Sequence, residues 1–205
     1  MRVLTWTRVA ILWFLCLGVA LASWRFMAWG VELTMGFVAY HAEIRPLAFY
    51  AHVILAPVAL ALVPFQLWQG LRIRRAVVHR VIGRVYGVAV MLSGAGGLWL
   101  AITTQSGAVA AWGFGLLAVF WLATTGWGIG LAMRGDRIGH QRWMTRSIAL
   151  TLSAVTLRIY LGLIFGFGLD FAPAYSAIAF LCWVPNLIIA ELILLRPRAS
   201  RSTMA

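Results

Sequence analysis

The chain has 205 residues, of which 63% are hydrophobic and only 11% are charged, and its mean hydropathy is +0.92. This composition excludes a soluble globular protein, because several apolar runs exceed the roughly 18 residues that indicate a membrane-spanning helix. The net charge of +12 comes from 17 arginines, without a lysine, against five acids. The arginines are divided among separate short loops, which argues against a nucleic-acid partner and favours a role in orienting the spans.

Six apolar segments are long enough to cross a bilayer, so we expect an all-α membrane protein, a single domain formed by a six-transmembrane-helix bundle. The predicted spans are 9–29, 46–71, 79–104, 107–133, 142–168 and 174–195, with spans two to five as the core. The first span follows two arginines and contains Ala-Leu-Ala-Ser, which also resembles a secretory signal. Hydrophobicity continues to Trp29, so we expect an uncleaved helix; cleavage would leave five spans in the same orientation.

The arginines predict how the spans are oriented. Fourteen of the 17 fall in the N-terminal segment, in 72–84, in 134–146 and in 196–201, and only Arg25, Arg45 and Arg158 fall on the other side. Positively charged loops remain in the cytoplasm, which predicts that the N and C termini are both cytoplasmic. The absence of lysine hints at a GC-rich bacterial gene, so we expect a multi-pass protein of a bacterial cytoplasmic membrane.

Span five contains the most polar stretch of any predicted span, "HQRWMTRSIALTLSAVTLR" at 140–158. Helical periodicity places His140, Ser147, Thr151 and Arg158 on one stripe. An arginine facing lipid would cost several kcal/mol, so the stripe is expected to face the bundle interior. Ser147, Thr151 and Arg158 then become candidates for lining a path for an anion or another ligand.

Two histidines at the cytoplasmic ends of spans three and five form a candidate cofactor site. His79 is followed one turn later by Gly83, which would leave room for a flat macrocycle, and His140 faces it from span five. Two such histidines can supply the axial ligands of a b-type haem. The neighbouring groups that would hold propionates, a quinone or an anionic lipid headgroup are Arg80, Arg84, Arg142 and Arg146, and Tyr86 would line the pocket. The structural alternative is a pair of hydrogen-bonded interfacial histidines with orientation-setting arginines.

Charge pairing is the main alternative for the remaining ionisable groups within the spans. Glu191 lies at the level of Arg84 and Arg146, and we expect it to form a structural ion pair there. Arg158 lies toward the outside, where the available carboxylates are those of Asp170, Glu43 and Glu32. Ion pairing and anion binding both remain open for Arg158.

Two segments resemble a known family. These are "PFQLWQGLRIRRAVVHRVIGRVYGVAV" at 64–90 and "HQRWMTRSIALTLSAVTLRIYL" at 140–161, and they are similar to the family named domain of unknown function 2306. That resemblance implies a bacterial multi-span membrane protein without an assigned activity.

The layout of histidines also resembles the transmembrane di-haem b cytochromes. This second resemblance implies His79 and His140 as one ligand pair, and His52 with His41 as the other. Those cytochromes place their ligands on core helices, whereas His41 falls in a predicted loop, so an outer haem is not expected.

The leading hypothesis is a membrane redox protein that binds b-type haem or a quinone between the cytoplasmic ends of spans three and five. The first alternative is a transporter or lipid-binding protein that uses the polar face of span five. The second is a non-catalytic assembly or scaffold protein. Motifs of hydrolases and zinc sites are absent from the sequence, and neither an enzyme class nor an oligomeric state is predicted.

Overall fold

The computed structural model describes residues 2–196, and every regular element in that range is helical. The elements are α1 (Arg2–Ser23), α2 (Phe26–Trp29), α3 (Val31–Met35), η1 (Gly36–Val38), α4 (Tyr40–Ile44), α5 (Pro46–Leu67), α6 (Gln69–Arg74), α7 (Ala76–Ile102), α8 (Ala108–Met133), α9 (Arg137–Thr151), α10 (Ser153–Phe167), α11 (Phe171–Leu181) and α12 (Val184–Leu195). Six stretches are long and apolar enough to cross a membrane, namely α1–α2, α5, α7, α8, α9–α10 and α11–α12. The expected all-α membrane bundle is therefore confirmed. The outward faces of these helices carry exposed apolar side chains, which a bilayer would cover.

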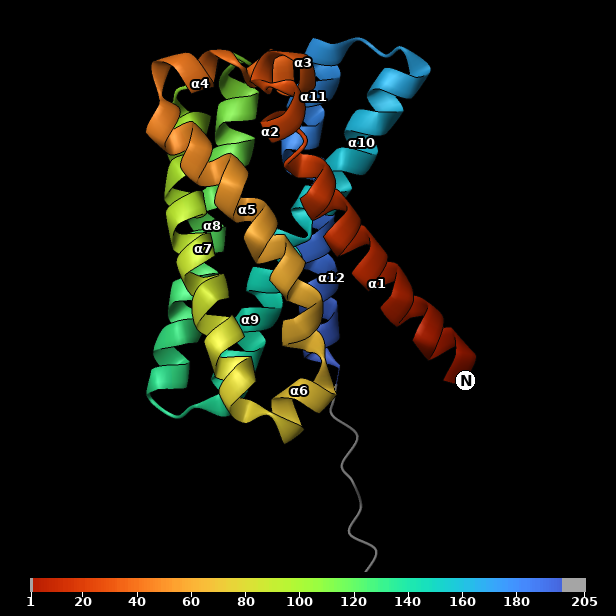
Figure 1. Ribbon diagram of the computed structural model, residues 1–205, viewed down its shortest axis with the longest axis vertical. Coiled ribbons are helices and arrows are strands. Elements are labelled where there is room, and N and C mark those ends of the chain that lie inside the picture. The colour runs from red at the N-terminus through yellow and green to blue at the C-terminus, as the bar shows by residue number, and fades with distance from the viewer. Residues whose placement is uncertain (1, 197–205) are drawn as a thin grey trace, which may run out of the picture.

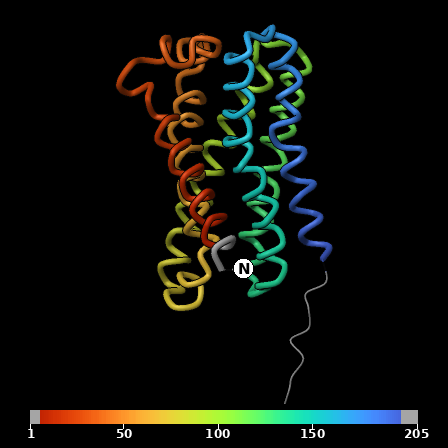
Figure 2. The backbone as a smooth tube through the Cα atoms, turned by 90° about the vertical axis from the view of Figure 1, so that its right-hand side faces the viewer, coloured from red at the N-terminus to blue at the C-terminus, as the bar shows by residue number. Residues whose placement is uncertain are grey.

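Four helices enclose the centre of the bundle. α7 packs against α5 and α8, α9 packs against α8 and also contacts α5, and the buried core between them includes Leu60, Tyr86, Trp121 and Leu150. α11 covers α8, α12 covers α9, and α1 packs on α5 and leans away from the bundle toward its start (Figure 1). Figure 2 shows α1 and α10 as neighbours on one face.

The two ends of the bundle differ. We call the end that carries α6 and the turn between α8 and α9 the inner end, and the end that carries α3 and α4 the outer end (Figure 1). The start of α1 and the end of α12 both lie toward the inner end. The names follow the orientation predicted from the arginines. The segment from Gly30 to Arg45 folds into the short helices α3, η1 and α4, which cap the outer end.

Two predicted spans are interrupted near their middle. The fifth span begins at Arg137, after Asp136 caps α9 by accepting a hydrogen bond from the Gly139 amide at 2.8 Å, and it breaks at Leu152. The sixth span breaks at Cys182–Trp183, just before Pro185, because proline lacks an amide hydrogen and suits the first turn of a new helix.

A single asparagine ties the two breaks together. The side-chain amide of Asn186 donates to Thr156 Oγ1 at 3.0 Å, to the carbonyl of Cys182 at 3.2 Å and to that of Ala149 at 3.4 Å. Polar side chains that satisfy carbonyls at such breaks let interrupted helices remain in a bilayer. The sequence analysis did not single out Asn186.

Candidate functional site

A cavity of about 720 Å³ occupies the outer half of the bundle. Its wall is built from the end of α1, the cap of short helices, α5, α7, α8 and α10, and its floor is formed by Trp121, Leu150 and Thr151. Ligand pockets in proteins span roughly 300–1,000 Å³ and are mostly apolar with a few polar groups. The cavity therefore has the size and the lining of a binding site.

The charged groups that line this cavity are all basic. They are the guanidinium groups of Arg25 and Arg158, and the lining includes neither aspartate nor glutamate; the imidazoles of His41 and His52 line the same cavity. Fixed positive charge inside apolar walls raises the local concentration of anions. The charge of the lining is therefore complementary to that of an anion.

Arg158 lies on α10, just past the break at Leu152. Its Nη2 donates to Ser23 Oγ at 3.3 Å, across the contact between α10 and α1, and its side chain is exposed. Within residues 2–196 it forms no ion pair, and none of the three carboxylates named from the sequence reaches it. This guanidinium is therefore available to a ligand.

Arg25 stands at the junction between α1 and α2. Its Nη2 donates to the carbonyl of Thr34 at 2.9 Å, which ties the cap to the end of α1. The charges of Arg25 and Arg158 lie near enough to act on each other. Two unpaired guanidiniums in one cavity would be stabilised by an oxyanion placed between them.

His52 is held in a fixed orientation within α5. Its Nδ1 lies 2.9 Å from the carbonyl oxygen of Ser93, so Nδ1 carries the hydrogen and donates it. Its Nε2 has no hydrogen-bond partner among the described residues. The imidazole lines the cavity and keeps a free lone pair on Nε2.

His41 is buried, although the sequence placed it in a loop. It belongs to α4, is only 3% exposed, and stacks on Tyr40 with ring centroids 4.1 Å apart. Its Nδ1 is buried without a partner among residues 2–196. Burial and the nearby Arg45 lower the pKa of His41 below its usual value, which keeps the ring neutral.

Buried hydroxyl groups form a network at the floor of the cavity. The Tyr86 hydroxyl lies 2.7 Å from both Ser147 Oγ and Thr151 Oγ1. Trp121 Nε1 donates to Thr151 Oγ1 at 2.9 Å, and Thr125 Oγ1 lies 2.7 Å from Ser147 Oγ. The predicted inward direction of Ser147 and Thr151 is confirmed, since both are buried. The sequence did not predict the roles of Trp121 and Thr125, because the sequence of α8 shows no polar stripe.

The inner histidines lie within electrostatic range of each other. His140 Nδ1 lies 2.8 Å from the Gly128 carbonyl oxygen, whereas His79 Nδ1 is buried and has no partner among the described residues. The space that the sequence assigned to a macrocycle beside Gly83 holds the side chain of Gln66, 3.6 Å from where a Cβ would stand. Arg80, Arg84 and Arg142 are exposed at this end, and the predicted haem or quinone site there stays a prediction.

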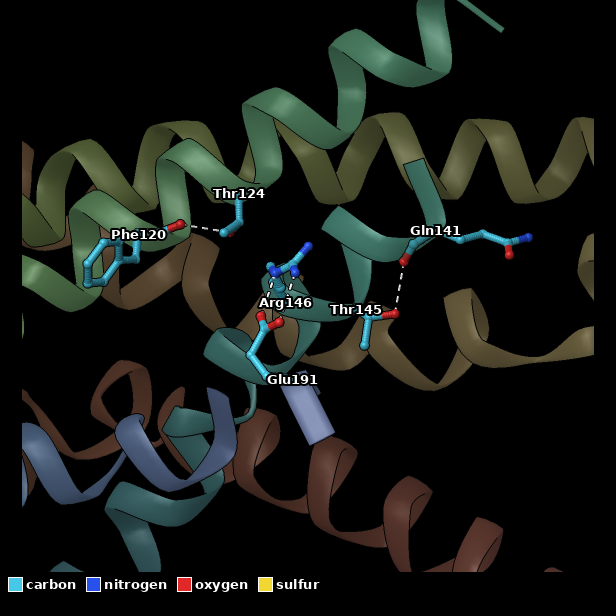
Figure 3. A network of polar contacts seen from close by, with 6 residues as sticks. All are labelled: Phe120, Thr124, Gln141, Thr145, Arg146 and Glu191. Atoms are coloured by element: carbon cyan, nitrogen blue, oxygen red, sulfur yellow. Dashed lines mark hydrogen bonds and ion pairs between the residues drawn. The ribbon is translucent and has the colours of Figure 1, made fainter. Parts of the chain in front are cut away.

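Arg146 forms the structural ion pair that was expected of Glu191. Its Nε and Nη2 donate to Glu191 Oε1 and Oε2 at 2.5 and 2.8 Å (Figure 3). The guanidinium carbon also lies 4.8 Å from the centre of the Trp143 ring. The pair joins α9 to α12 near the inner end. Arg146 is thus occupied by a carboxylate of the protein itself.

Comparison with curated proteins found no match, and comparison with solved structures found none either. A family model, described as a predicted membrane protein, matches residues 49–194. The matched region contains His52, Arg158, His79 and His140, and it leaves out Arg25 and His41 of the cap. Because the match covers most of the chain, the protein belongs to the DUF2306 family of predicted membrane proteins.

Proposed function

We propose that this membrane protein binds an anionic amphiphile in the outer cavity, with Arg25 and Arg158 holding the acidic headgroup. The observation that carries the proposal is the lining itself, which combines two arginines and two histidines with apolar walls and no carboxylate. A guanidinium binds phosphate and carboxylate oxygens in a planar, bidentate geometry. The apolar wall suits the hydrocarbon part of the same ligand.

The position of Arg158 adds a physical reason. It stands in the outer half of a predicted span, and Ser23 is the neighbour to which its guanidinium donates. A charge at this depth costs several kcal/mol unless water or a counter-charge accompanies it. An oxyanion in the cavity would supply that counter-charge, from either a lipid headgroup or a free phosphate.

Ligand binding to the purified protein in detergent tests this proposal. The probes are a short-chain fluorescent phosphatidic acid, the matching phosphatidylcholine, and inorganic phosphate as a competitor. We expect phosphatidic acid alone of the two lipids to bind, and Arg158→Gln and Arg25→Gln each to weaken binding about 10-fold or more, because hydrogen bonds to charged groups contribute about 1.5–3 kcal/mol. Arg134→Gln, at the exposed inner end, is the matched control and should bind normally.

Each outcome has a definite meaning for the source of the ligand. Competition by millimolar phosphate would identify a free anion, and resistance to it would identify a lipid. Equal binding of both lipids, or an Arg158→Gln variant that binds as tightly as the wild type, would overturn the proposal.

A second candidate is a haem or quinone site at the inner histidine pair. The buried, unpartnered Nδ1 of His79 favours it, since such an atom costs free energy unless something binds there. It predicts a haem spectrum or quinone binding that is lost in His79→Ala and His140→Ala. An assembly or scaffold role, by contrast, predicts that these variants change stability alone.

A further inference from the structure

We infer that the anionic amphiphile of the outer cavity is an iron porphyrin of the b-type haem class, with His52 and His41 as its axial ligands. The inference rests on the proposed function, because Arg25 and Arg158 would bind the two propionates. It also explains the two imidazoles, because a phospholipid headgroup does not require them.

His52 has the arrangement of a metal-binding histidine. Metal-ligating imidazoles commonly donate their other ring N–H to a carbonyl or carboxylate, which fixes the tautomer and the ring direction. His52 does this through Nδ1 and the Ser93 carbonyl at 2.9 Å, and its Nε2 remains without a partner. The ring is also held from the side by α7, where Gly97 leaves room for it. The free Nε2 is therefore oriented before any ligand arrives.

His41 supplies the second imidazole of the same cavity. It is nine-tenths or more buried, and its Nδ1 lacks a hydrogen bond, which is a costly state for a polar atom. An outer haem was not expected from the sequence, because His41 falls in a predicted loop. The structure removes that reason, because α4 folds over the cavity and places His41 in its wall.

The remainder of the cavity meets the other needs of a porphyrin. Its volume of about 720 Å³ and its apolar side chains, Phe49, Leu60, Leu157 and Phe165 among them, suit a flat hydrophobic macrocycle. The porphyrin itself supplies four ligands to the iron, so the protein needs only one or two.

Absorption spectroscopy of the full chain, purified in mild detergent from cells supplied with a haem precursor, tests the inference. We expect a stoichiometric Soret band and, after reduction of the iron by dithionite, the sharp α-band of a six-coordinate, low-spin haem. His41→Ala should convert it to a five-coordinate, high-spin spectrum. His52→Gly should lose the haem and regain a low-spin spectrum when imidazole is added, which a variant that had merely misfolded would not do. His79→Ala and His140→Ala distinguish the outer site from the inner histidine pair, and an outer haem predicts that both keep the wild-type spectrum.

Other spectra would overturn the haem assignment, the proposed function or both. Low-spin haem that persists in His52→Gly, or that disappears only in the inner variants, would overturn the assignment, and the latter would favour the inner site. A colourless, folded protein that still binds phosphatidic acid through Arg158 would overturn this inference and leave the proposed function standing. A colourless protein that binds neither probe would overturn both.

Discussion

His52 of α5 lies directly against Gly97 of α7, where any side chain would overlap its ring. A Cβ added at Gly97 would lie 2.7 Å from His52 Nδ1, well inside normal contact. The neighbouring Gly96 brings the two backbones together, since a Cβ there would lie 2.6 Å from the carbonyl oxygen of Ala48. Two adjacent glycines thus let a polar ring enter a helix interface and reach the Ser93 carbonyl.

Gly97→Ala should therefore displace His52. We expect the overpacked interface to cost about 1–3 kcal/mol of unfolding free energy, as added methyl groups in packed cores do. Denaturation of the purified protein in mixed micelles measures this. Gly130→Ala is the control, because no atom lies within 4 Å of its added Cβ, and the helix propensity of alanine should leave it unchanged or slightly stabilised. Equal losses in both variants would contradict the proposed contact.

Tyr86→Phe should weaken the buried hydroxyl network while leaving the packing nearly unchanged. Hydrogen bonds between membrane helices contribute about 0.6 kcal/mol on average and up to about 1.7, so we expect a loss of about 1 kcal/mol. The same denaturation assay measures it. Tyr160→Phe, whose hydroxyl has no hydrogen bond to another described residue, should cost nothing measurable. A double variant with Thr151→Val should lose less than the sum of the two single losses, because both changes remove the same bond.

Glu191→Gln should have only a small effect, although it removes a bidentate ion pair. The side chain of Glu191 is 41% exposed and that of Arg146 is 18% exposed, so solvent and salt screen the attraction. We expect a loss below about 1 kcal/mol that shrinks further in high salt. Glu43→Gln, at an exposed carboxylate that forms no ion pair within residues 2–196, provides the baseline. A loss of several kcal/mol would mean that the pair is shielded from water.

His41 should make the stability of the protein depend on pH. Burial and Arg45 lower its pKa in the folded protein, so the unfolded chain binds a proton at a higher pH than the folded chain does. The stabilisation by a neutral His41 is therefore complete above the unfolded pKa of about 6.5 and is lost as the pH falls through the folded pKa. Unfolding free energies measured between pH 8 and pH 5 should decline, and His41→Gln should flatten that decline. A His41→Gln profile parallel to the wild type would contradict the prediction.

The sequence alone predicted the existence of the six spans and part of the inward-facing polar stripe, because these depend on local hydrophobicity and helical periodicity. The six spans follow from runs of apolar residues, and the inward direction of Ser147 and Thr151 follows from their spacing on one helix. The pairing of Glu191 with an arginine was predictable because an acid near the end of a span needs a counter-charge. Arg146, which forms the pair, was one of the two arginines expected at that level, the other being Arg84.

Only the tertiary structure decided which distant residues share a site. His41, His52 and Arg158 come from three different helices and Arg25 from the junction between α1 and α2, and no periodicity within one segment connects them. The burial of His41 depends on how α4 folds over α5, and the filling of the space beside Gly83 depends on the side chain of Gln66 from another helix. Cavities form where neighbouring helices fail to touch, and that separation is set by contacts such as those of Gly96 and Gly97, which hydrophobicity does not encode.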